Sequence, residues 1–109
     1  MKNYSLGEFE ELVLLVVAGQ NGEAYGVTIQ ETLTSHLSRN INISAVHVAL
    51  KRLEDKGFVE SKFGGITEER GGRRKKFYHI TGLGKQAIDA QYQLRTSLYQ
   101  KIPKLSFGQ

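Results

Sequence analysis

The 109-residue sequence contains no cysteine, no tryptophan and a single proline, Pro103. The absence of cysteine excludes disulfide bonds and thiolate metal sites, and it fits a reducing cytoplasm. The longest apolar run spans residues 12–18, far short of the roughly 18 apolar residues that a membrane-spanning helix needs. Charges in residues 1–11 are mostly acidic, unlike those of a signal peptide. We therefore expect a cytoplasmic protein without a membrane partner.

The charge is unevenly distributed along a chain whose net charge is only +4. Five of the seven residues in 70–76 are basic, whereas glutamates crowd the N-terminal third. This asymmetry favours a polyanionic partner on one face. A single domain of this length can bury about two thirds of its unfolded surface and fold without covalent cross-links.

The apolar periodicity and the capping residues predict a mostly helical α+β fold. Helices are expected over 5–18, 26–37, 44–56 and 81–101, and hairpin strands over 58–63 and 75–80. Ser5 and Glu8 have capping-box spacing, and Ser44 and Thr81 can cap the third and last helices. Residues 41–43 are interpreted as either a brief strand or an extended lead-in.

The third helix has two unlike sides, because successive residues rotate by about 100°. Its core side is expected to carry Val46, Ala49, Leu50 and Leu53. The opposite side and its flanks carry the candidate DNA-binding residues Ser44, Ala45, His47, Val48, Lys51 and Arg52. Small, polar and basic side chains of this kind suit phosphates and base edges in a major groove. The alternative is an ordinary solvated helix face.

A basic hairpin tip follows this helix directly. Arg70, Arg73 and Arg74 are the better candidates for phosphate or minor-groove contacts, and Lys75 and Lys76 are expected to be partly positional. The Gly-Gly-Arg-Arg-Lys-Lys stretch lacks the Gly-Lys-Ser/Thr ending of a phosphate loop, so a nucleotide site is not expected. A charge run that only aids solubility is the alternative. A helix followed by a basic hairpin is the layout of a DNA-binding winged helix-turn-helix.

Two helices carry more apolar surface than one small protomer can cover. The first is apolar nearly all round, so we expect a second subunit to cover one flank. The last has a wide apolar surface, typical of a core or a dimer seam. The candidate dimer-interface residues are Phe9, Leu12, Val16, Leu83, Ala87, Ile88, Gln91, Tyr92, Leu94, Arg95, Leu98, Tyr99 and Ile102.

Five segments occur in an order that resembles the PadR-like transcriptional regulators, in particular the short members with one C-terminal helix. They are Leu12–Leu15, Tyr25–Ile29, Ala49–Gly57, Gly72–Tyr78 and Ile80–Gly84. The resemblance implies a winged helix over 1–81 and a dimerisation helix and tail over 82–109, joined in one compact domain. It also implies that the last helix packs against the partner's first helix, and that the protein represses or modulates promoters.

The sequence departs from the family at the recognition helix, where the usual Thr-Leu-Tyr-Pro is Ala45-Val46-His47-Val48. The family's tyrosine commonly contacts the DNA backbone, and His47 is shorter and titratable. Some members bind flat aromatic compounds at the dimer centre, sometimes between tryptophans. Here Phe9, Tyr92 and Tyr99 are the candidates for lining such a pocket, although core stacking explains them equally well.

No cofactor, metal site or enzymatic activity is predicted. The residues His36, His47 and His79 fall on three different predicted elements, and no nucleophile–base grouping can be assembled. We therefore expect a homodimeric, sequence-specific transcriptional regulator, a repressor, that binds double-stranded DNA. Its operator would be pseudo-palindromic, with half-sites about 34–36 Å apart. The alternatives are a winged helix for protein contacts and a regulator whose main role is sensing a planar aromatic compound.

Overall fold

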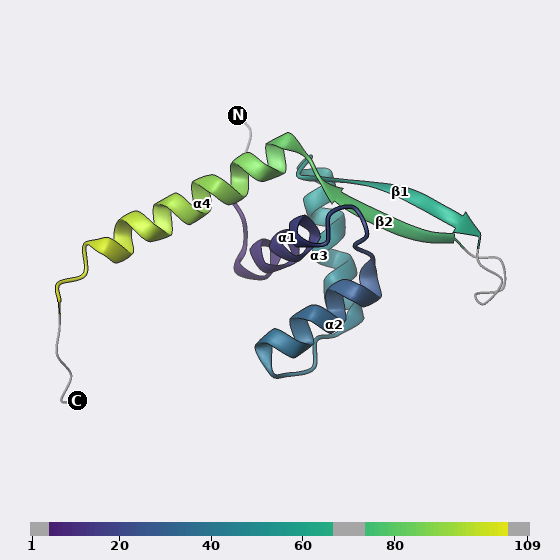
Figure 1. Ribbon diagram of the computed structural model, residues 1–109, viewed down its shortest axis with the longest axis horizontal. Coiled ribbons are helices and arrows are strands. Elements are labelled where there is room, and N and C mark those ends of the chain that lie inside the picture. Colours follow the sequence, from purple (N-terminus) through teal and green to yellow (C-terminus); the bar gives the residue numbers. More distant parts are fainter. Residues whose placement is uncertain (1–4, 67–73, 105–109) are drawn as a thin grey trace.

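The structure is a computed structural model that describes residues 5–66 and 74–104 (Figure 1). These residues form four helices and a two-stranded antiparallel sheet. In chain order the elements are α1 (Glu8–Gly19), α2 (Gly26–Leu37), α3 (Ile43–Asp55), β1 (Val59–Ile66), β2 (Arg74–Ile80) and α4 (Gly82–Gln100). The predicted number, type and order of elements are confirmed.

Two predicted helix starts, at residues 5 and 44, differ from the observed starts at Glu8 and Ile43. The Glu10 carboxylate, not that of Glu8, accepts a backbone N–H at the start of α1, from Gly7 at 3.4 Å. At α3 the cap is Asn42, whose Oδ1 accepts the Ser44 N–H at 2.7 Å. Asparagine and serine cap helices about equally well, so neighbouring candidates compete for one position. The predicted cap at Thr81 is confirmed by its bond from the Gly84 N–H at 3.0 Å.

The core lies where α1, α2, α3 and the start of the hairpin meet. Its largest fully buried side chains are Phe58, Leu14, Ile29, Leu50, Leu53, Val13, Val17, Val46 and Val59. Each such side chain stabilises the fold by roughly 1.5–3 kcal/mol relative to an exposed position. One flank of α1 remains open, because Leu15 is 44% exposed. The structure therefore leaves part of the all-round apolar α1 without cover in the protomer.

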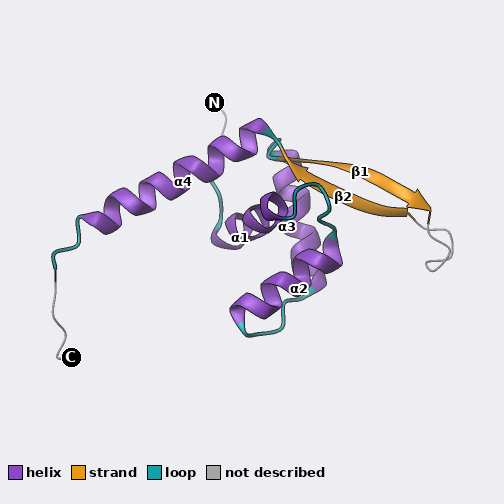
Figure 2. Ribbon diagram, in the orientation of Figure 1, coloured by secondary structure: helices purple, strands orange, loops and turns teal. Residues whose placement is uncertain are grey.

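The hairpin of β1 and β2 projects away from the helical body (Figure 2). Its register runs from Val59 opposite Ile80 to Phe63 opposite Lys76, and shifts before Ile66. The hairpin is joined to the body where the Tyr78 N–H donates to the Ala24 carbonyl at 2.8 Å. The wing is thus held against the segment that leads into α2.

Helix α4 leaves the body as a long arm (Figure 1). It has 19 residues and is therefore roughly 28 Å long. Only Gly84, Ala87 and Ile88 of this helix are buried. Gly84 is required at the crossing, because a Cβ there would collide with the Phe58 carbonyl oxygen. The predicted division at residues 81 and 82 stays a prediction.

This arrangement is a mostly helical α+β winged helix-turn-helix with an additional C-terminal helix. Among residues 5–66 and 74–104, no helix combines the length and apolar character needed to cross a membrane.

Candidate nucleic-acid interface

Helix α3 presents the two sides that the sequence predicts. Val46, Ala49, Leu50 and Leu53 are buried in the core. The exposed residues are Ser44, Ala45, His47, Val48, Lys51, Arg52 and Asp55. Val48 is 52% exposed despite being apolar. The exposed side of α3 therefore combines a protruding methyl surface with hydroxyl, imidazole and cationic groups.

Lys51 already has a partner on its own helix. Its Nζ lies 2.9 Å from Asp55 Oδ1, one turn along α3, and both side chains are mostly exposed. The hydrogen bond with Asp55, and then the charge of Asp55, raise the pKa of Lys51. Exposed pairs of this kind contribute little to stability. Lys51 can therefore exchange Asp55 for another anion at small cost.

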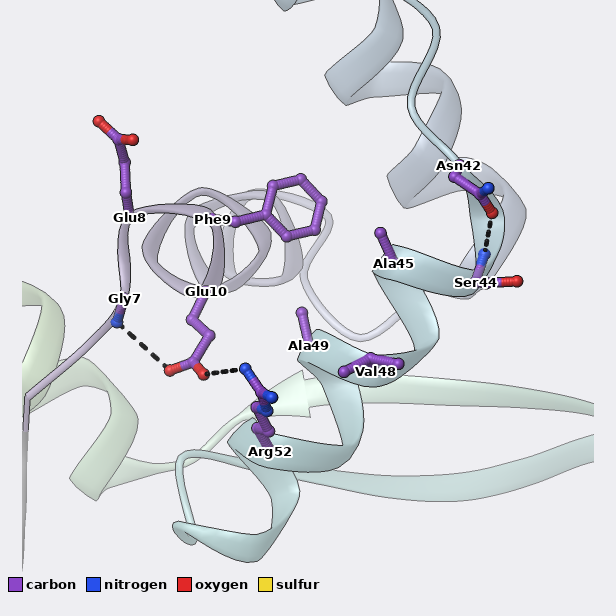
Figure 3. A pocket seen from close by; sticks show the side chains of 10 residues that line it. All are labelled: Gly7, Glu8, Phe9, Glu10, Asn42, Ser44, Ala45, Val48, Ala49 and Arg52. Atoms are coloured by element: carbon purple, nitrogen blue, oxygen red, sulfur yellow. Dashed lines mark hydrogen bonds and ion pairs between the residues drawn. The ribbon is translucent and has the colours of Figure 1, made fainter.

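Arg52 lies on the flank of α3 that faces the start of α1 (Figure 3). Its Nη1 is 3.8 Å from Glu10 Oε2, while Lys56 Nζ lies 2.7 Å from Glu10 Oε1. Burial alone would raise the pKa of Glu10, but hydrogen bonds from Lys56 and Gly7 and the charges of Lys56 and Arg52 lower it overall. Glu10 is thus a buried carboxylate that ties the start of α1 to the end of α3.

A hollow of about 550 Å³ lies between α1 and α3 on this flank. Its lining residues are Gly7, Glu8, Phe9, Glu10, Asn42, Ser44, Ala45, Val48, Ala49 and Arg52. Figure 3 shows Phe9 directed from α1 toward Ala45 and Ala49 of α3, with the Glu8 carboxylate pointing away from them. The hollow therefore combines small, mostly apolar side chains and Arg52 of α3 with two carboxylates of α1.

The opposite flank of α3 faces the root of the wing. Here a smaller hollow of about 170 Å³ is lined by Tyr25, Gly26, Val27, His47, Lys75, Lys76 and Tyr78. We call it the wing-root hollow. Since His47 belongs to α3 and the two lysines belong to β2, the recognition helix and the wing contribute side chains to the same concavity.

Lys76 is held at this hollow by a carboxylate and a ring. Its Nζ is 3.9 Å from Glu54 Oε1 and 5.7 Å from the centre of the Tyr78 ring. Burial, and then the charge of Glu54, raise the pKa of Tyr78. Glu54 also accepts the Ser61 hydroxyl at 2.9 Å. Lys76 therefore contributes to holding the wing beside α3.

Several residues of the two flanks were not among the sequence candidates. Glu10 and Glu54 set which cations are neutralised, and Tyr25 contacts Lys75. Tyr25 lies in a segment that resembles the family, but the sequence alone gives it no role. Arg70 and Arg73 lie outside the described residues, and only the backbone of Arg74 is described. Their predicted phosphate contacts stay predictions.

The candidate dimer residues divide into covered and exposed groups. Ala87 and Ile88 are buried in their own protomer, and Phe9, Leu12, Val16, Leu83 and Gln91 are partly buried. The exposed apolar group consists of Tyr92, Leu94, Leu98, Tyr99 and Ile102. Arg95 forms an ion pair with Glu11 of α1 at 3.0 Å. A further hollow of about 450 Å³ lies along α1 and α2, where Leu12, Leu15 and Leu37 contribute to an apolar lining.

The candidate histidines lie apart. His36 Nδ1 is 2.9 Å from the Thr32 carbonyl, and His79 Nε2 is 3.1 Å from Glu60 Oε1. In the part of the chain that the structure describes, no three histidine or carboxylate side chains gather in a way that could hold a metal ion.

The family model of the PadR-like transcriptional regulators matches residues 13–90, which extend from α1 to the first half of α4. The chain belongs to this family. Because the family is one of transcriptional regulators, the predicted resemblance and the predicted non-enzymatic role are confirmed.

Solved structures agree on the fold of this PadR-like chain. A PadR-like transcription factor from Bacteroides fragilis superposes with a TM-score of 0.73 at 18% identity, over 84% of each chain. RosR of H. salinarum gives 0.71 at 21% identity, over 91% of this chain and 82% of that one. An uncharacterized protein of Lysinibacillus sphaericus is 27% identical over 81 residues, or 72% of this chain and 70% of the relative.

Proposed function

We propose that this PadR-like chain is a homodimeric, sequence-specific DNA-binding repressor that acts in the cytoplasm. In this proposal α3 lies in the major groove, and the wing lies along the flanking phosphate backbone. The observation that carries the proposal is the shared concavity of His47, Lys75 and Lys76. It supports a geometry in which one duplex contacts α3 and the wing at the same time.

The exposed chemistry of α3 supports reading of base edges. Lys51 can donate to guanine, Ser44 can bond to a phosphate or a base edge, and Val48 can contact a thymine methyl group. Because Lys51 and Ser44 are exposed, their side chains can contact DNA without disturbing the core. We infer that these residues discriminate among sequences, and that the wing cations supply affinity that is independent of sequence.

A matched pair of lysines tests this function. Lys51→Ala and Lys85→Ala each remove one exposed lysine that is paired with an aspartate four residues later, at 2.9 and 2.8 Å. Lys51 lies on α3, whereas Lys85 lies on α4. Gel shift would measure the binding of labelled duplexes from the region upstream of the protein's own gene, and of random duplexes. We expect Lys51→Ala to reduce discrimination by about tenfold, and Lys85→Ala to leave it unchanged.

Two results would contradict the proposal in different ways. Failure of the unaltered protein to retard any duplex at low salt would favour a winged helix used for protein contacts. Equal behaviour of the two lysine variants would remove Lys51 from the reading surface.

The proposed dimer rests on the exposed stripe of α4. Tyr92, Leu98 and Tyr99 recur at helical spacing and are largely exposed, with Tyr99 75% exposed, and the exposed Ile102 follows just beyond the end of the helix. An apolar stripe of this length is typical of a surface that another chain covers. The open flank of α1 beside Leu15 offers a complementary apolar surface. A dimer would impose two-fold symmetry on the operator.

The dimer is tested by placing the same new charge on and off the stripe. Leu98→Asp should shift the molecular mass in light scattering from dimer to monomer, because it would bury a carboxylate in the apolar seam. Gln93→Asp introduces the same charge at another exposed position of α4 and should leave the dimer intact. A Leu98→Asp variant that remains dimeric would remove the stripe from the interface.

A further inference from the structure

We propose that the wing-root hollow binds one phosphate group of the DNA backbone, held chiefly by Lys75 and Tyr25. This inference rests on the proposed DNA-binding function and deepens it, because it assigns a phosphate site at the root of the wing, away from the hairpin tip. Neither Tyr25 nor the start of α2 is among the contacts that the sequence suggests.

The first support is the uncompensated charge of Lys75. Its ammonium lies 4.5 Å from the centre of the Tyr25 ring and 3.4 Å from the Tyr25 hydroxyl. No carboxylate of the described residues is within ion-pair distance of it, whereas the neighbouring Lys76 is paired with Glu54. An aromatic ring orients a cation without neutralising it. An anion that enters the hollow therefore meets a full positive charge in a fixed position.

The second support is the direction of the hydrogen bond between these two side chains. Lysine has donors only, so the Tyr25 oxygen accepts from Lys75. The hydroxyl proton of Tyr25 is left available to another acceptor. The ring itself is held edge-on by Phe77, at 5.5 Å between centroids and 79° between planes. Lys75 and Tyr25 thus form a preorganised pair of donors.

The third support is the close packing of His47 on the start of α2. A Cβ at Gly26 would lie 2.8 Å from His47 Cε1, so the absence of a side chain there allows the imidazole to approach. The N–H groups of the first helical turn lack intrahelical acceptors and attract anions. Gly26 and Val27 of this turn line the same hollow as Lys75 and Tyr25.

The size and position of the hollow fit a phosphate group of a duplex. Its volume of about 170 Å³ is several times the roughly 30 Å³ that one water molecule occupies. The hollow lies between α3 and β2. When α3 is inserted in the major groove of a duplex, the hollow would therefore face the DNA backbone that borders this groove. Lys75 would then act as a direct ligand, in addition to the partly positional role that the sequence suggests.

The test uses the complete chain and a random-sequence duplex, with binding followed by fluorescence anisotropy over a range of salt concentrations. Lys75→Gln should weaken binding about tenfold at low salt and reduce the log–log salt slope by about 0.9, the value for one phosphate contact. Tyr25→Phe keeps the ring and removes only the hydroxyl. It should weaken binding by about fivefold and leave the slope unchanged.

Two control variants separate the hollow from general wing charge and from loss of fold. Lys62→Gln removes an exposed lysine from β1 of the same hairpin, outside the hollow. Lys75→Arg keeps the charge and should retain the salt slope. Equal effects of Lys62→Gln and Lys75→Gln would overturn the proposal. Thermal unfolding of each variant shows whether it is folded. If Lys75→Gln is not folded, the effect of Tyr25→Phe on binding tests the proposal.

The remaining outcomes separate this proposal from the function on which it rests. An unaltered protein that binds no duplex would overturn both, whereas normal binding by Lys75→Gln and Tyr25→Phe would overturn the hollow alone. Titration with inorganic phosphate, followed by the amide signals of Gly26 and Val27, distinguishes the source of the anion. Saturation by free phosphate with DNA binding unaffected by Lys75→Gln would overturn a DNA phosphate as the occupant.

Discussion

The two flanks of α3 both carry basic side chains, but those side chains meet different partners. On the α1 flank, Arg52 and Lys56 share the buried carboxylate of Glu10. On the wing flank, Lys75 rests on the ring of Tyr25. With Glu8 and Glu10 the α1 flank has two carboxylates for its two cations. On the wing flank Glu54 pairs with Lys76, and the aromatic ring does not cancel the charge of Lys75, so this flank remains positive. The availability of a cation is decided by residues far away in the chain.

The largest expected effect comes from removing the carboxylate that neutralises the α1 flank. Glu10→Gln should lower the free energy of unfolding by about 2 kcal/mol, because it breaks charge-assisted hydrogen bonds at a buried site. For a chain of this size that corresponds to about 10 °C in the unfolding midpoint. Urea unfolding followed by circular dichroism measures the change.

Glu8→Gln is the matched control for this variant. It makes the same substitution in the same turn of α1 at an exposed residue, and should change stability little. Equal losses in the two variants would show that Glu10 acts through general charge near α1 rather than through Lys56.

A smaller effect is expected in the pH dependence of the stability that Glu10 contributes on the α1 flank. The pKa of Glu10 is lowered in the folded chain. Its contribution is therefore complete above the ordinary glutamate pKa of about 4.3, and is lost as the pH falls through the lower folded value. The stability difference between the unaltered protein and Glu10→Gln should be constant near neutral pH and shrink below about pH 4. Urea midpoints measured from pH 7 to pH 3 check this, and a difference that grows on acidification would contradict it.

The smallest expected effect concerns the exposed pair on α3 itself. Asp55→Asn releases Lys51 and removes a negative charge from the proposed DNA-facing side. Stability should change by less than the error of a urea titration, since the pair is exposed. Duplex binding should tighten by about twofold at low salt and by less at high salt. Asp89→Asn breaks the equivalent pair on α4 and should leave binding unchanged.

Much of the fold could be predicted from local sequence patterns, because helix faces and strand alternation are short-range properties. The core side of α3 follows from the spacing of Val46, Ala49, Leu50 and Leu53 and is confirmed. Exact caps could not be predicted where two suitable residues are close together, as with Asn42 and Ser44.

The partners of the candidate cations could not be predicted, because they are distant in the sequence. Glu10 and Lys56 are 46 residues apart, and Tyr25 and Lys75 are 50 apart. Spacing rules describe neighbours on one helix or strand and give no information on such pairs. The sequence therefore predicted which side of α3 is exposed, but not which of its flanks remains positive.

The crossing of α4 over the start of the hairpin has a mechanical consequence. Because Gly84 lies directly against the carbonyl of Phe58, the start of α4 contacts the junction between α3 and β1. We therefore expect a tilt of α4 to displace this junction. Such a displacement is expected to change the angle between α3 and the wing. A partner that binds one orientation of α4 more tightly than another would then alter that angle, and with it the affinity of the proposed interface for DNA.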